Sequence, residues 1–113
     1  MTLTEAADLL PDAIQLRRRL HRQPEVGLHL PATQEAVLEA LDGLPLTIRT
    51  GKALTSVVAI LDGGQPGPTV LLRGDMDALR MPEDTGIKYA SEIPGVMHGC
   101  GHDAHVAMLS QHF

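Results

Sequence analysis

The stretch MHGCGHDAH, residues 97–105, gathers three histidines and the only cysteine of the 113-residue chain within nine positions. Glycines flank the cysteine on both sides, so the backbone bends there at little steric cost. In an extended segment alternate side chains share a face, which places His98, Cys100 and His102 on one side. A bend at the glycines then lets a thiolate and an imidazole reach one ion, at about 2.3 Å for sulfur and 2.0–2.1 Å for nitrogen. The alternative is a polar loop whose histidines only form hydrogen bonds with the backbone.

A second stretch, TVLLRGDMD at residues 69–77, reads as an apolar strand that runs into two aspartates. Asp75 and Asp77 are two positions apart, so they project from the same side of the strand's end, where open α/β sheets place their ligand sites. One of these carboxylates can orient a metal-bound histidine. The alternative is a turn with two solvated aspartates.

Four segments together resemble the amino-terminal signature of a known enzyme family. They are LRRRLHRQPEVG at 16–27, LRGDMDAL at 72–79, EDTG at 83–86 and PGVMHGCGHDAH at 94–105. In this order they are similar to the metal-dependent N-acyl-amino-acid amidohydrolases, which include hippurate hydrolases, bacterial aminoacylases and plant auxin-conjugate hydrolases. The chain departs from the pattern at Arg80, where proline is usual, and at Gly99, where alanine is usual.

The resemblance implies an α/β fold with a mixed sheet flanked by helices, as in the catalytic domain of zinc-peptidase-like enzymes. In that family a smaller dimerisation domain interrupts the catalytic domain. We therefore expect residues 1–113 to be the amino-terminal part of the catalytic domain, with the remainder of that domain and the dimerisation domain absent.

The resemblance also implies roles for individual residues. Cys100 and His102 match two metal ligands, and Asp77 matches the catalytic aspartate that orients a ligand near the metals. Asp75 occupies a position where other branches of the superfamily have a ligand histidine. His98 and His105 are expected to be local hydrogen-bonding partners. The cofactor implied is Zn or Mn, with two ions in the full-length parent.

The activity implied is hydrolysis of the amide bond of an N-acyl amino acid or peptide by a metal-activated water. The family's general base, a glutamate, and its further metal ligands match nothing within residues 1–113, so we expect the isolated fragment to be inactive. The competing hypothesis is a truncated, non-catalytic remnant that folds or self-associates and binds metal weakly. A structural zinc ribbon is disfavoured because the chain has one cysteine.

The composition indicates which classes of partner, and which cellular location, to expect. A net charge of −5 gives no reason to expect binding to nucleic acid or to an anionic membrane. One cysteine and the lack of a signal-peptide pattern suit a cytoplasmic protein. Apolar strands with unpaired edges predict a homo-oligomer.

Periodicity predicts the following elements. Helices are expected over residues 10–22, with Pro11 in the first turn, over 31–41, and from Ala104 onward. Strands are expected over 46–50, over 56–61 with both faces covered, and over 69–73, the last two forming an antiparallel pair. Residues 80–96 are expected to be an irregular loop anchored by Ile87 and Tyr89.

Overall fold

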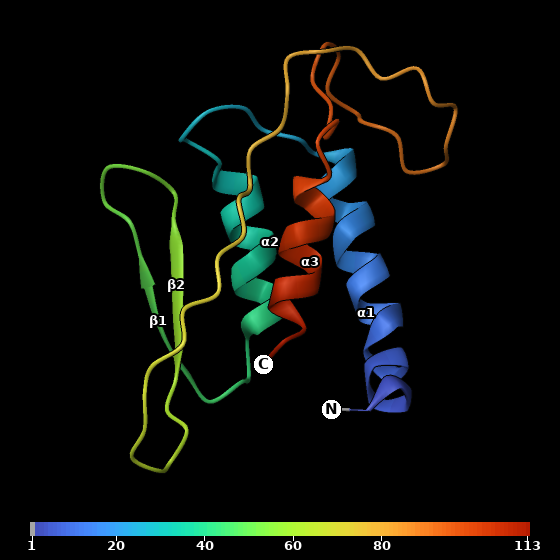
Figure 1. The fold of residues 1–113 in the computed structure, drawn as a ribbon. Helices are drawn as coiled ribbons and strands as arrows, with labels where there is room; N and C mark the ends of the chain where they lie inside the picture. Colours follow the sequence, from blue (N-terminus) through green and yellow to red (C-terminus); the bar gives the residue numbers. More distant parts are fainter. Residues whose placement is uncertain (1) are drawn as a thin grey trace.

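The computed structural model describes residues 2–113 and contains three helices and two strands. The elements are α1 (Leu3–Arg22), α2 (Pro31–Leu41), β1 (Leu46–Thr50), β2 (Val57–Leu61) and α3 (His102–Ser110). The helices pack together and the β1–β2 hairpin lies beside α2 (Figure 1). The irregular segment after β2 runs along the helices to their other end, where the 80–96 loop lies (Figure 1). The α/β class is confirmed at this level.

Helix α1 is longer than the sequence predicted. It begins at Leu3, not at residue 10, because Thr2 and Glu5 form a capping box. The Thr2 side chain accepts from the Glu5 N–H at 3.2 Å, and the Glu5 carboxylate accepts from the Thr2 N–H at 2.6 Å. Pro11 therefore lies inside the helix and not in its first turn, which removes one helical hydrogen bond.

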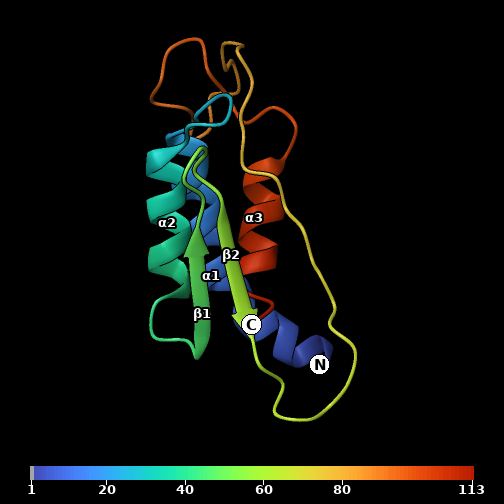
Figure 2. The same cartoon turned by 90° about the vertical axis from the view of Figure 1, so that its left-hand side faces the viewer.

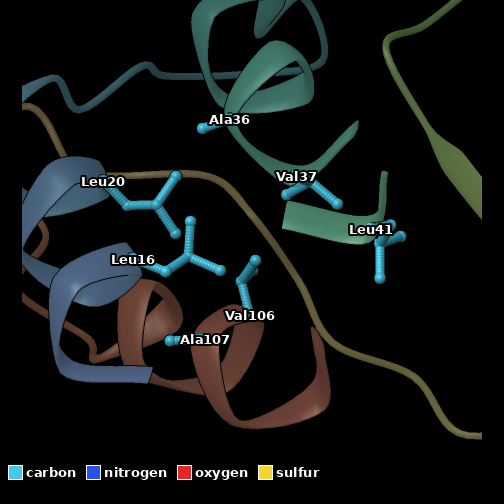
Figure 3. Packing of buried hydrophobic residues seen from close by; sticks show 7 residues of the cluster. All are labelled: Leu16, Leu20, Ala36, Val37, Leu41, Val106 and Ala107. Carbon is cyan, nitrogen blue, oxygen red and sulfur yellow. The ribbon is translucent and has the colours of Figure 1, made fainter. Parts of the chain in front are cut away.

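The hydrophobic core lies between the three helices. Figure 3 shows that its side chains come from α1, α2 and α3 and point toward one another. They are Leu16, Leu20, Ala36, Val37, Leu41, Val106 and Ala107. Leu16 and Leu20 are four residues apart, so they lie on one face of α1, and that face meets α2 and α3. Packing of these faces sets the position of the α3 start.

Helix α2 forms where the sequence predicted it, with Pro31 in its first turn. Its free N–H groups are capped from outside the helix by Glu25. The Glu25 carboxylate accepts from the Ala32 N–H at 3.2 Å and from the Thr33 N–H and hydroxyl, both at 2.7 Å. The turn after α1 therefore fixes the start of α2.

Strands β1 and β2 form an antiparallel hairpin with Leu46 opposite Leu61 and Thr50 opposite Val57. Both strands lie within a residue of their predicted positions, but the prediction that 56–61 is covered on both faces is wrong. Val58 and Ile60 are 50% and 44% exposed, because the hairpin contacts the helices only along one side (Figure 2). The continuous apolar sequence therefore predicted the strand itself correctly but predicted its burial wrongly.

The predicted strand 69–73 is not formed, and neither is its pairing with 56–61. Strand β2 pairs instead with β1, from which only a short turn separates it. Within residues 2–113 the backbone of 69–73 has no ladder partner, so Val70 and Leu71 remain 78% and 86% exposed. The expected mixed sheet is therefore represented among the described residues by two antiparallel strands.

The loop at 80–96 is irregular, as predicted, and is closed at its base. Leu79 and Met97 exchange two backbone hydrogen bonds of 2.9 and 3.0 Å. Tyr89 anchors the loop as expected: its hydroxyl accepts from Arg17 at 3.0 Å, and its ring lies under Arg18, 4.8 Å from the guanidinium carbon. Among residues 2–113 no helix is both long and apolar enough to cross a membrane.

Candidate metal centre

Two segments far apart in the sequence meet at the start of α3. Gly101 has φ +82°, a left-handed conformation that glycine adopts without strain, and α3 begins directly after it. Gly74 lies so close to α3 that a Cβ there would be 3.2 Å from the Leu109 side chain. This close approach brings the two aspartates that follow Gly74 to the histidines of the first turn of α3.

Asp75, His102 and His105 form a group of metal-binding donors. The two Asp75 oxygens lie 3.3 Å from His105 Nδ1 and 3.3 Å from His102 Nε2. His102 and His105 are three residues apart on α3, which places their rings side by side at 5.6 Å. One donor atom from each residue lies within 4.8 Å of the other two. Carboxylate and imidazole donors this close fit one divalent ion at about 2.0–2.2 Å from each.

Asp77 fixes the orientation of His102. The Nδ1 of His102 lies 2.8 Å from the Asp77 carbonyl oxygen and 2.9 Å from its carboxylate. Both are acceptors, so Nδ1 donates and carries the proton, which leaves the Nε2 lone pair free for an ion. This is the geometry expected of an orienting aspartate. The catalytic role of Asp77 itself stays a prediction.

The electrostatics suit a cation at this position. A hydrogen bond from His105 lowers the pKa of Asp75 below its ordinary value, and the nearby charge of Arg73 acts in the same direction. Burial opposes this shift without reversing it. Asp75 is therefore ionised at neutral pH and presents an anionic donor to the two imidazoles.

The structure brings together only some of the residues singled out from the sequence. His102 and Asp77 are in contact, whereas Cys100 is exposed and lies outside the donor group. The assignment of Cys100 as a ligand stays a prediction. His105, expected to be a hydrogen-bonding partner only, does contact Asp75 but also belongs to the donor group. The three-residue spacing of His102 and His105 on a predicted helix indicates that both side chains lie on one face, and this could have identified His105 from the sequence.

His98 differs from its expected role. It is 4% exposed, and neither ring nitrogen has a hydrogen-bond partner among residues 2–113. The prediction that it forms local hydrogen bonds is not met in the described part of the chain. Burial lowers the pKa of His98, because the low-polarity surroundings disfavour its charged form.

A buried charged network behind the donor group was missed from the sequence. Asp103 is completely buried, and its Oδ2 lies 2.8 Å from both Arg17 Nε and His21 Nδ1. The other nitrogen of His21 lies 2.9 Å from Glu83 in the 80–96 loop. The four-residue spacing of Arg17 and His21 places both on one face of α1. All four network residues also lie in the segments that resemble the enzyme family, but nothing in those segments indicated that they contact one another.

Glu83 is held in its charged form within this network. Burial alone would raise its pKa, but hydrogen bonds from the Thr85 hydroxyl, the Ser91 N–H and His21 outweigh burial and lower it below its ordinary value. The Glu83 side chain is 3% exposed, so these contacts are almost fully shielded from water.

Comparison with known proteins places these features in a family. Residues 71–113 match the model of Peptidase family M20/M25/M40. Thermostable carboxypeptidase 2 of Saccharolobus solfataricus is 45% identical over 97 residues, which are 85% of this chain and 25% of that protein. The N-acyl-L-amino acid amidohydrolase of Geobacillus stearothermophilus is also 45% identical, over 87% of this chain and 26% of that protein.

A solved structure agrees with the sequence matches. The Bacillus subtilis YXEP protein, a dinuclear metal-binding peptidase from the M20 family, superimposes with a TM-score of 0.83 at 33% identity. The match covers 93% of this chain and 31% of that one. The chain spans about a quarter of the length of the curated relatives that it matches. By sequence and by fold, it is similar to the proteins of Peptidase family M20/M25/M40.

Proposed function

We propose that this chain supplies part of the active site of a metal-dependent hydrolase that cleaves the amide bond of N-acyl amino acids. The observation that carries the proposal is the state of His102, whose Nδ1 donates to Asp77 while its Nε2 faces Asp75 beside His105. The substrate class is supported by the similarity to an N-acyl-L-amino acid amidohydrolase.

The proposed roles follow from the contacts. His102 binds an ion through Nε2, and Asp77 keeps the proton on the opposite nitrogen. Asp75 and His105 offer two further donors, and Cys100 offers a thiolate two residues before His102. The chemistry that a bound divalent ion supplies is activation of water and polarisation of the scissile carbonyl. Imidazole, carboxylate and thiolate donors suit Zn, and similarity to a dinuclear peptidase supports two ions, of Zn or Mn, in the whole protein.

The 113 residues alone are proposed to bind metal without turning over substrate. Amide hydrolysis needs a general base as well as the ion, and loss of such a base typically costs about 10²–10⁴ in rate. Glu83 does not supply this base, because its carboxylate is hydrogen-bonded to His21, Thr85 and Ser91 and its side chain is only 3% exposed. The alternative is a non-catalytic remnant that self-associates through the exposed apolar residues of the hairpin and of 69–72. In either case a homo-oligomer in the cytoplasm is the assembly and location that we propose.

The test is metal content and hydrolysis of N-acetyl and N-benzoyl amino acids by the full-length protein in which these residues occur. His102→Ala is expected to abolish both metal binding and turnover, and Asp77→Asn to reduce metal affinity or rate by about 10- to 100-fold. His112→Ala is the matched control, because His112 is exposed and lies outside the donor group. Near wild-type metal content and turnover in His102→Ala would refute the proposed site.

The isolated chain tests whether residues 1–113 hold a complete catalytic site. It is assayed with added zinc or manganese against the metal alone. Bound metal without turnover is the expected result. Turnover clearly above the metal control, abolished by Cys100→Ser, would show that residues 1–113 hold a complete site.

A further inference from the structure

The first turn of α3 has two faces with different surroundings. His102 and His105 face the aspartates, with side chains 19% and 51% exposed. Asp103, between them in sequence, is completely buried against α1. Neighbouring residues on a helix point about 100° apart because 3.6 residues make one turn. Whatever holds Asp103 therefore also sets the direction in which His102 points.

Two side chains from α1 hold Asp103. Arg17 and His21 each place a nitrogen 2.8 Å from the same oxygen, Oδ2. Such charge-assisted hydrogen bonds are short and directional. A carboxylate with no water contact is held in one orientation by them, so they define the rotation of the α3 start about its own axis.

His21 also connects Asp103 to the 80–96 loop. Its Nε2 binds Glu83 of the 80–96 loop, and the base of that loop is closed by Leu79 and Met97, which follow Asp77 and precede His98. The Glu25 carbonyl, four residues beyond His21, accepts from the Ala78 N–H at 2.8 Å. The end of α1 holds the helix that carries His102, and the turn directly after α1 holds the segment that carries Asp77.

We propose that His21 is a positioning residue of the metal centre. Through its Nδ1 bond to Asp103, it sets the rotation of α3 at which His102 Nδ1 meets Asp77. This inference rests on the proposed function, because it concerns the same centre. The competing explanation is that His21 only stabilises the fold. Buried ion pairs often contribute little net stability, and some of them specify geometry instead.

Two substitutions of His21 separate its two bonds. The amide nitrogen of Asn lies as many bonds from Cβ as Nδ1 of His, and that of Gln lies as many as Nε2. His21→Asn therefore keeps a donor toward Asp103, and His21→Gln keeps one toward Glu83. Each variant loses one of the two hydrogen bonds and the ring, so a general loss of packing affects both. Only His21→Gln removes the bond that we propose matters for His102.

The first measurement is the ¹⁵N and ¹H spectrum of the His102 ring in the metal-free 113-residue chain. In the wild type and in His21→Asn we expect an Nδ1-protonated ring with a slowly exchanging proton bound to Asp77. In His21→Gln we expect a mixture of tautomers and fast exchange. The second measurement is zinc affinity by calorimetry, which should fall by about 3- to 30-fold in His21→Gln and by less than about twofold in His21→Asn.

Leu41→Ala is the matched control for stability. Leu41 belongs to the hydrophobic core and is the last residue of α2, and it forms none of the hydrogen bonds of the charged network (Figure 3). If His21→Gln does not fold, as judged by circular dichroism, Arg17→Gln decides by the same readouts, because Arg17 is one-third exposed and binds the same Asp103 oxygen.

The outcomes are distinct. A changed His102 ring in His21→Gln (or Arg17→Gln), with normal rings in His21→Asn and Leu41→Ala, supports the proposal. An unchanged ring in a folded His21→Gln, or equal changes in all variants including Leu41→Ala, overturns it. Absence of zinc binding by the wild type would overturn the proposed metal centre, while the metal-free spectra would still decide the role of His21.

Discussion

The helical part and the sheet part of this chain use the same kinds of apolar residue and bury them very differently. Leu20 of α1 and Val106 of α3 are 2% and 5% exposed, whereas Val58 of β2 and Leu71 are 50% and 86% exposed. The helices find partners among residues 2–113, since each turns one face to the other two. The two strands pair only with each other, and the hairpin packs against the helices along one side, through Leu46, Val57 and Ala59. Apolar patterning therefore predicts which surfaces need a partner without saying whether one is within reach.

The largest expected difference is in stability. Leu20→Ala should lower the free energy of unfolding by about 2–5 kcal/mol, because it opens a cavity in the core. Val58→Ala removes the same kind of atoms from a half-exposed strand and should cost less than about 1 kcal/mol. Urea unfolding followed by circular dichroism measures both. Equal losses of unfolding free energy in the two variants would mean that the exposed face of the hairpin is buried in solution.

The second prediction concerns the charged network that supports the helical part. Glu83→Gln weakens hydrogen bonds to a buried carboxylate and should cost about 1–3 kcal/mol at neutral pH. Because the folded state lowers the pKa of Glu83, its contribution is fully present above the ordinary value of 4.5 and is lost as the pH falls through the lower folded pKa.

The wild-type and Glu83→Gln stabilities should accordingly converge in acid. Unfolding curves at pH 7, 5, 4 and 3 test this. Glu39→Gln is the matched control, because Glu39 forms an exposed pair with Arg19 that salt screens. A difference between wild type and Glu83→Gln that stays constant from pH 7 to pH 3 would show that the Glu83 charge contributes nothing.

Much of the fold was predictable from the sequence where signals were local. Pro31 and the stop after Leu41 define α2, and alternation defines the strand 46–50. The start of α1 was misplaced because the capping box at Thr2 was overlooked, although its residues are visible in the sequence. The predicted strand at 69–73 failed for a different reason. Strand formation depends on a partner backbone, and no local pattern specifies one.

The residues of the candidate site also divide into those that the sequence predicted and those that it did not. Asp77 and His102 were chosen from a resemblance, and the structure places them in contact. Asp103 is the buried centre of a network that joins residues 17, 21 and 83, and no sequence pattern pointed to it. Its partners lie more than 80 residues away in sequence, so only the packing of α3 on α1 reveals them.

The third prediction concerns self-association of the sheet part. Val70 and Leu71 are among the most exposed apolar residues, and burying each side chain contributes about 1.5–3 kcal/mol. Replacing both with lysine should raise the dissociation constant of an oligomer by about tenfold or more. Sedimentation velocity over a wide concentration range measures it, with the exposed Ala53→Lys as the control. A wild-type chain that stays monomeric throughout would contradict this.

The smallest expected effect on stability concerns α1. Its two halves differ in the same way as the helices and the strands: one half buries its apolar residues and the other exposes them. Leu16 is its first buried residue, while Leu3 and Leu10 are 91% and 55% exposed. Pro11 separates the halves and removes one helical hydrogen bond. The amino-terminal half is therefore held mainly by its own cap, and it can fray without opening the core.

Thr2→Ala removes the hydroxyl that accepts from the Glu5 N–H. Such a change commonly costs about 0.5–2 kcal/mol, but here the loss should remain local, with a change in global unfolding below about 0.5 kcal/mol. Helical circular dichroism should decrease slightly, and the Glu5 amide should exchange faster, while Thr2→Ser retains both. A global loss above about 1 kcal/mol would place the first half of α1 in the same cooperative unit as the core. The exposed start of the helix would then contribute to the stability of the site at its other end.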